Sequence, residues 1–303
     1  MIKDFTHQTA LITGAASGLG LECAKRAAEL GMHLLLVDVN AKALEAACQE
    51  IIPLTKALGS SCHFFVCDVS DPGAMRSLGE QVVKEHTVPH LVMNNAGIAS
   101  GGLIWEHTAQ EWDRVLRVNV WGVINGVTVF TPLMLAAAQK DPHWRGHIIN
   151  TASMAGLLTP PNMGIYNVSK HAVVALTETL YQDLRLVSSQ LSASVLCPYF
   201  VPTAINQSFD DALGSATQSQ IISKQMLDKA VVSGKVSARD VALKVFDALE
   251  LDQFYIFSHP QALGNVQKRM QAILDNTQPP DPFALRPEIG WELREALKAN
   301  PNS

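Results

Sequence analysis

Short apolar runs alternate with longer amphipathic stretches along most of the chain. The runs are rich in Val, Ile and Leu, which predicts strands that are buried on both faces. We expect these strands at Ala10–Thr13, His33–Asp38, His63–Cys67, Leu91–Asn94, His147–Thr151, Ser192–Leu196 and Phe254–Phe257. Helical spacing of apolar residues predicts helices at Leu19–Leu30, Ala41–Leu58, Pro72–Lys84, Thr108–Ala138, Ile165–Ser188 and Ala238–Leu249.

This regular alternation predicts an α/β fold with a doubly wound parallel sheet of about seven strands. Because crossovers between parallel strands are right-handed, few other topologies fit the pattern. Neither an internal repeat nor a second sheet-forming region is apparent. We therefore predict a single domain over residues 1–277, followed by a C-terminal tail over residues 278–303.

Two regions interrupt the alternation. Residues 203–236 are polar and longer than an ordinary connection, which is typical of a substrate-binding loop or lid. The tail begins with Pro279-Pro280-Asp281-Pro282, which predicts an extended segment, and an amphipathic helix is expected at Glu292–Lys298.

Composition narrows the class of protein. Of the 303 residues, 48% are hydrophobic and 17% are charged, which is enough apolar material for a large core. The net charge of −5 and the lack of a basic run argue against a nucleic-acid partner. The uncharged segment Val118–Gln139 is long enough to span a bilayer, but its Asn, Thr, Gly and Pro residues favour a helix buried in the fold, so no membrane association is expected.

The five cysteines are odd in number and have neither Cys-x-x-Cys nor metal-ligand spacing. We expect free thiols in a reducing compartment, the cytoplasm, and no metal site. The first seven residues lack the apolar core of a signal peptide.

A glycine-rich loop, Thr13–Gly20, follows the first predicted strand and opens the first helix. Glycine allows a close approach of the backbone to a pyrophosphate, and a helix N-terminus offers free N–H groups. The loop therefore predicts a dinucleotide site that includes Gly14, Ala16, Ser17, Gly18, Leu19 and Gly20.

Asp38 ends the second strand, where a carboxylate can accept hydrogen bonds from the adenosine ribose. The same carboxylate would repel a 2′-phosphate, and its neighbours Val37, Val39 and Asn40 carry no positive charge. This favours NAD over NADP. Further cofactor residues are expected at the ends of the third and fourth strands, namely Asp68, Val69, Asn95, Ala96 and Gly97.

Tyr166 and Lys170 are one helical turn apart, so the phenol and the ammonium project from the same face. Lowering a tyrosine pKa from about 10 to about 7 requires roughly 4 kcal/mol, which one ammonium at about 4 Å supplies at an effective dielectric constant of about 20. Tyr166 is thus a candidate acid/base group. Ser153 follows a buried strand, and its hydroxyl can hold a substrate oxygen.

In this combination and order, the sequence resembles the short-chain dehydrogenase/reductase family through about residue 258. The matching motifs are Thr13–Gly20, Asn94–Gly97, and the Ser153, Tyr166 and Lys170 set, with Asn119 in the long central helix. The resemblance implies a Rossmann-like fold and assigns Asn119 to a water that links Lys170 to solvent. It also implies that Lys170 binds the nicotinamide ribose, Asp68 the adenine, Asn95 the adenosine side, and Val201 and Thr203 the nicotinamide amide.

The same resemblance implies a homodimer or homotetramer built partly on the helices Thr108–Ala138 and Ile165–Ser188. The chain departs from the family after Pro198, where Tyr199 replaces a glycine. Apolar or aromatic candidates for the substrate side are Met154, Met163, Tyr199, Phe200 and Met226.

These residues favour an NAD-dependent oxidoreductase acting on an apolar, cyclic or acyclic, secondary alcohol or ketone. Two alternatives stay open: a nucleotide-binding sensor or partner protein without turnover, and an enzyme that retains NAD for epimerisation or dehydration.

Overall fold

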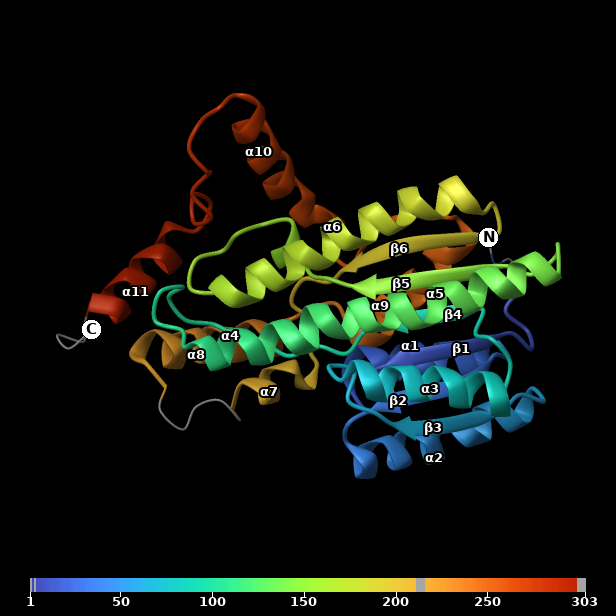
Figure 1. Cartoon of the computed structure of the whole chain (residues 1–303). Coiled ribbons are helices and arrows are strands. Elements are labelled where there is room, and N and C mark those ends of the chain that lie inside the picture. Colours follow the sequence, from blue (N-terminus) through green and yellow to red (C-terminus); the bar gives the residue numbers. More distant parts are fainter. Residues whose placement is uncertain (1, 3, 211–215, 299–303) are drawn as a thin grey trace.

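The computed structural model describes residue 2, residues 4–210 and residues 216–298, which fold around a seven-stranded sheet (Figure 1). All of the strand pairs are parallel, in the order β3-β2-β1-β4-β5-β6-β7. The strands are β1 (Thr9–Thr13), β2 (His33–Asp38), β3 (Cys62–Val66), β4 (Leu91–Asn94), β5 (Gly146–Thr151), β6 (Leu191–Cys197) and β7 (Tyr255–Phe257). The predicted doubly wound α/β fold is confirmed, with strand ends that shift by one residue.

Helices cover both faces of the sheet (Figure 1). On one face, α1 (Gly18–Glu29), α2 (Ala41–Ala57) and α9 (Ala238–Glu250) bury their apolar sides in one core. On the other face, α3 (Pro72–Glu85), α5 (Gly122–Lys140) and α6 (Gly164–Val187) form a second core. This double covering explains why every residue of β1, β4 and β5 is buried.

The order in which successive strands are added to the sheet reverses at β1: β2 and β3 lie on one side of it, and β4 to β7 lie on the other. The strand β1 pairs with β2 on one side and with β4 on the other, so the connections after β1 and β4 diverge. Such a reversal leaves a crevice at the carboxyl edge of the sheet, where ligands bind in doubly wound folds.

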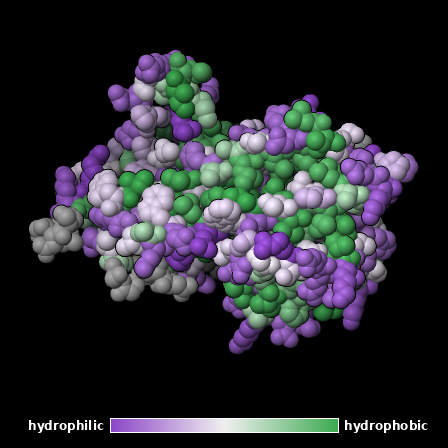
Figure 2. Space-filling model, viewed as in Figure 1, coloured by the Kyte–Doolittle hydropathy of each residue, from purple (hydrophilic) through white to green (hydrophobic). Residues whose placement is uncertain are grey.

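The predicted helix Thr108–Ala138 consists of α4 (Ala109–Leu116), a π-helical turn (Arg117–Trp121) and α5. Together, Ala109–Lys140 is long and apolar enough to cross a membrane, a test that core helices of globular proteins also pass. Its buried side includes Phe130 and Met134, which pack against the sheet. Its other side leaves apolar residues at the surface, where Figure 2 shows them over α5 and α6.

Residues 203–236 differ from the predicted loop, because they include the helices α7 (Gln207–Asp210) and α8 (Gln218–Val232). Residues 211–215 lie outside the described part of the chain. The helix α10 (Leu263–Leu274) was also not predicted; it holds no buried residue, and its apolar residues Met270, Ile273 and Leu274 are exposed.

The tail helix α11 (Pro287–Lys298) begins five residues earlier than the predicted helix Glu292–Lys298. It packs against α8 and buries Leu293. The tail residues 299–303 lie outside the described part, and the division of the chain at residue 277 stays a prediction.

Candidate active site

A cavity of about 1590 Å³ opens at the carboxyl edge of the sheet. Loops after β1, β2, β3, β4, β5 and β6 line its inner wall, and α8, α10 and the tail line its outer wall. Of the residues predicted for the site, only Ala16, Gly20 and Asn119 do not line this cavity.

The glycine loop is shaped by close backbone contacts. Gly14 has a φ of 65°, and a Cβ there would lie 2.9 Å from the Cα of Ala96. A Cβ on Gly20 would lie 2.1 Å from the carbonyl oxygen of Gly14. Ser17 precedes α1, but its side chain makes no capping hydrogen bond. The first N–H groups of α1 therefore stay available to an anion such as a pyrophosphate.

Asp38 lies at the end of β2 and faces the cavity. One carboxylate oxygen accepts a hydrogen bond from the backbone N–H of Ala16 at 3.1 Å, and the other accepts from Asn40 at 3.0 Å. The carboxylate is thus held beside the glycine loop. Ala16 contributes to this arrangement through its backbone rather than through a place in the cavity wall.

Asn95, which follows β4, is hydrogen-bonded to the ends of β1 and β5. Its amide nitrogen donates to the carbonyl oxygen of Thr13 at 3.1 Å, and its amide oxygen accepts from the hydroxyl of Thr151 at 3.2 Å. The backbone N–H groups of Asn95 and Ala96 both donate to the Thr13 hydroxyl. The Asn94–Gly97 segment therefore holds the switch-point loops in place as well as lining the cavity.

Asn119 is fully buried in the π-helical turn. Its side chain accepts from the backbone N–H of Ile98 at 2.8 Å, and donates to the Ile98 carbonyl at 3.0 Å and to the Ser169 hydroxyl at 3.1 Å. Both ends of the amide are thus occupied by protein groups. This geometry shows Asn119 joining the loop after β4 to α6; the water-binding role implied by the family resemblance stays a prediction.

Ser153, Tyr166 and Lys170 all line this cavity. Tyr166 and Lys170 come from the first turns of α6, and Ser153 follows β5. The ammonium of Lys170 donates to the carbonyl oxygen of Thr151 at 3.0 Å and lies 5.6 Å from the centroid of the Tyr166 ring. The Ser153 hydroxyl donates to the carbonyl of Pro198 at 3.3 Å and accepts from the N–H of Ala155 at 3.1 Å.

The pKa of Tyr166 differs from the value expected from its spacing to Lys170. Burial raises the pKa of Tyr166 to about 12, and an interaction with the Ser153 hydroxyl only partly opposes the rise. Burial also lowers the pKa of Lys170 to about 8. The prediction considered the attraction between the two groups but omitted the desolvation of each, which is the larger effect here. The phenol is therefore neutral at pH 7.

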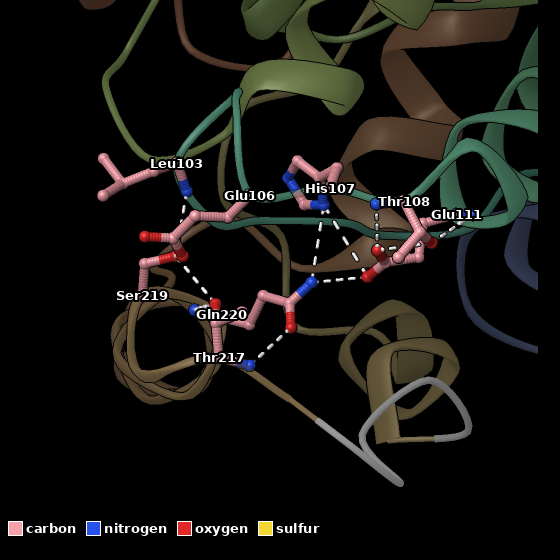
Figure 3. A network of polar contacts seen from close by, with 8 residues as sticks. All are labelled: Leu103, Glu106, His107, Thr108, Glu111, Thr217, Ser219 and Gln220. Carbon is pink, nitrogen blue, oxygen red and sulfur yellow. Dashed lines mark hydrogen bonds and ion pairs between the residues drawn. The ribbon is translucent and has the colours of Figure 1, made fainter. Parts of the chain in front are cut away.

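A polar network joins α8 to α4 and to the segment before α4 (Figure 3). The amide of Gln220 contacts the carboxylate of Glu111 and lies 3.4 Å from the Nδ1 atom of His107. The Ser219 hydroxyl donates to Glu106 at 2.6 Å and accepts from the backbone N–H of Leu103 at 2.9 Å. The side chain of His107 is buried within this network.

The five predicted substrate residues all line the cavity: Met154, Met163, Tyr199, Phe200 and Met226. Met154 is buried, whereas 43% of Tyr199 is exposed. The Tyr199 ring packs against Phe200 at 4.6 Å and against His259 at 5.8 Å between ring centroids. The ring that replaces the family's usual glycine thus forms part of an aromatic wall beside the site.

Sequence analysis left the role of the C-terminal tail open and named none of its residues for this wall. Apolar tail residues that line the cavity are Phe283, Leu285, Ile289 and Leu293. Their spacing at 285, 289 and 293 follows a helical face, a signal that could have extended the predicted helix toward the N-terminus.

Comparisons with known proteins agree with this geometry. The family model "short chain dehydrogenase" matches residues 8–214. A curated protein of Lactiplantibacillus plantarum, "CLA biosynthesis dehydrogenase/reductase", is 31% identical, and the match covers 92% of this chain and 97% of that protein. The "C alpha-dehydrogenase" of a Sphingobium species is 29% identical, over 98% of this chain and 94% of that protein.

A solved short-chain dehydrogenase/reductase from Burkholderia phymatum, in complex with NAD, is 43% identical with a TM-score of 0.84. The match covers 93% of this chain and 99% of that chain. The matched region includes the glycine loop, the Asn94–Gly97 segment and the Ser153, Tyr166 and Lys170 set. The chain therefore belongs to the short-chain dehydrogenase/reductase family, whose members are oxidoreductases that bind a nicotinamide cofactor.

Proposed function

We propose that the protein is an NAD-dependent dehydrogenase that interconverts an apolar secondary alcohol, cyclic or acyclic, and its ketone. The observation that carries the proposal is the convergence of Ser153, Tyr166 and Lys170 on the cavity that the glycine loop also lines. The apolar wall beyond these residues supports a substrate with a hydrocarbon body rather than a sugar or a phosphate.

The chain's own residues handle the oxygen and its proton. When bound, NAD(H) accepts or donates the hydride. In ketone reduction, the neutral phenol of Tyr166 donates its proton to the carbonyl oxygen, and in oxidation its phenolate accepts the alcohol proton. The Ser153 hydroxyl holds the same oxygen in both directions, and the Lys170 ammonium favours the phenolate electrostatically.

NAD is preferred over NADP in this proposal because Asp38 lies beside the glycine loop. Its carboxylate suits the two ribose hydroxyls and repels a 2′-phosphate. The immediate neighbours Val39 and Asn40 carry no positive charge that would offset this repulsion. The NAD complex of the Burkholderia phymatum relative supports the same choice.

An assay of NADH formation with a panel of apolar secondary alcohols tests this function. We expect turnover with NAD and a clearly lower kcat/KM with NADP. A protein that binds NAD without turning over any alcohol would be a sensor or partner protein instead. Conversion of the substrate without net NADH would indicate the epimerase or dehydratase alternative.

We further propose a cytoplasmic homodimer or homotetramer. All five cysteines are free thiols, as expected in a reducing compartment. On α6, Leu186 is 83% exposed and Val187 is 68% exposed, and Trp121 on the neighbouring helical turn is 53% exposed. Light scattering that gives the mass of a single chain would contradict the oligomer.

A further inference from the structure

The outer end of the cavity carries an excess of positive charge. Outside the nucleotide end and Lys170, five basic and two acidic side chains line it. They are Lys229, Lys235, Lys268, Arg269 and Arg286, with Asp281 and Glu292. The chain as a whole has a net charge of −5, so the local excess of positive charge is opposite in sign to the net charge of the protein.

Two of these cations project from one face of α10. Asn265, Lys268 and Arg269 follow the i, i+3, i+4 spacing of a helical face, and all three line the cavity. The third cation, Arg286, precedes α11 and lies close enough to Tyr199 to oppose the rise in the pKa of its hydroxyl. The three cations thus approach the cavity from two elements of the C-terminal region.

Within the described part of the chain, the side chains of Lys268, Arg269 and Arg286 have no ion pair or hydrogen bond. No ion pair joins Asp281 to these cations among the described residues, and its carboxylate accepts from the backbone N–H of Phe283 at 2.8 Å. Cations of a structural network would have such partners. Three unpaired cations on one cavity wall instead provide a binding site for an anion.

The cavity that these cations share with the Ser153, Tyr166 and Lys170 set also has an apolar wall. The wall includes Leu158, which follows β5, and Ile222 and Met226 on α8. Phe283 and Ile289 of the tail complete it. A substrate that fills this space therefore has a carbinol at one point, a hydrocarbon body along the wall and an anionic group at the outer end.

We propose that the substrate is an apolar secondary alcohol carrying a carboxylate, which Lys268, Arg269 and Arg286 bind at the outer end of the cavity. This inference rests on the proposed function, because the position of the carbinol is taken from it. The cations determine specificity: they select the acid over an uncharged molecule with the same hydrocarbon body.

Calorimetric binding to the NAD-loaded protein tests the inference directly. The probes are a long-chain saturated fatty acid, its methyl ester and its coenzyme A thioester. We expect the acid to bind at least about tenfold more tightly than the ester, with an affinity that falls as salt rises. Equal affinities for acid and ester would overturn the inference, and a tighter thioester would overturn the carboxylate assignment.

The variant Arg286→Gln, combined with Lys268→Gln, should reduce the preference for the acid by about tenfold and leave the ester's affinity unchanged. Arg294→Gln is the matched control, because Arg294 lies in α11, which Arg286 directly precedes, but does not line the cavity. A preference that persists in the double variant would contradict the assignment of these cations.

Turnover separates this inference from the function on which it rests. NADH formation from a mid-chain hydroxy fatty acid and from its methyl ester reports on the dehydrogenase activity itself. If neither of them and no alcohol of the panel is oxidised while the acid binds as expected, the proposed function fails and the anion site stands. If both are oxidised with equal kcat/KM, the function stands and the anion site fails.

Discussion

At the scale of single residues, the spacing of Tyr166 and Lys170 determines where the two side chains lie, and their burial determines their pKa values. The four-residue spacing of Tyr166 and Lys170 was sufficient to predict that both lie on one face of α6. Their pKa values depend on a feature that spacing does not contain, namely the loss of water around both groups. Tyr166 is 9% exposed and Lys170 is 3% exposed, so burial raises the pKa of the phenol and lowers that of the ammonium.

This protonation predicts opposite pH profiles for the two directions of the reaction. Because the pKa of Tyr166 is raised to about 12, the proton needed for reduction is present throughout the neutral range. The kcat/KM for ketone reduction should therefore be flat between about pH 6 and about pH 7.5. It should fall as the pH rises through the lowered pKa of Lys170 at about 8, if the ammonium aids binding of the cofactor.

Alcohol oxidation requires the phenolate, which becomes more abundant as the pH rises toward the Tyr166 pKa. Its kcat/KM should rise by up to about tenfold per pH unit across the same neutral range. Steady-state kinetics in both directions measure these profiles. An oxidation rate that does not change with pH would contradict the assignment of Tyr166 as the base.

At the scale of elements, the strongest local patterns predicted the sheet and its covering helices, but not the outer wall of the site. The strands β1, β4 and β5 are buried on both faces, and each carries a short apolar run that identifies it in the sequence. The helix α8 is different: its buried residues include Ser219, Gln220 and Ser223. Polar contacts with distant residues position it, and local periodicity does not predict such contacts.

The network in Figure 3 therefore holds α8 in its position. Gln220→Ala removes the amide that contacts Glu111 and His107 and that accepts from Thr217. Leaving these buried groups unpaired costs about 1–3 kcal/mol. We expect hydrogen exchange of the amides in residues 218–232 to accelerate by about tenfold, while exchange in β1 and β5 stays unchanged.

The control for this experiment is Gln271→Ala on α10, which removes an exposed hydrogen bond to Asp275. It should leave the exchange of α8 unchanged. Unaltered α8 exchange in Gln220→Ala would mean that the network does not hold this helix.

At the scale of the whole molecule, the order of elements predicted the fold, and the ends of the strands predicted most of the inner site. Right-handed crossovers place β1 beside both β2 and β4, which brings Gly14, Asp38 and Asn95 to one crevice. The contribution of the tail could not be predicted in the same way. The tail helix α11 packs against α8, which lies far from it in the sequence, so its place in the cavity wall depends on the completed fold.

The central claim is that the Tyr166 hydroxyl transfers the proton in a reaction that NAD completes. The most direct measurement is NADH formation by Tyr166→Phe, together with its affinity for NAD by calorimetry. Tyr181→Phe on the same helix is the control, since Tyr181 packs against Phe254 away from the cavity. We expect turnover to fall by about a hundredfold or more, with NAD affinity within about tenfold of the unaltered protein. Retention of more than about a tenth of the turnover would contradict the account.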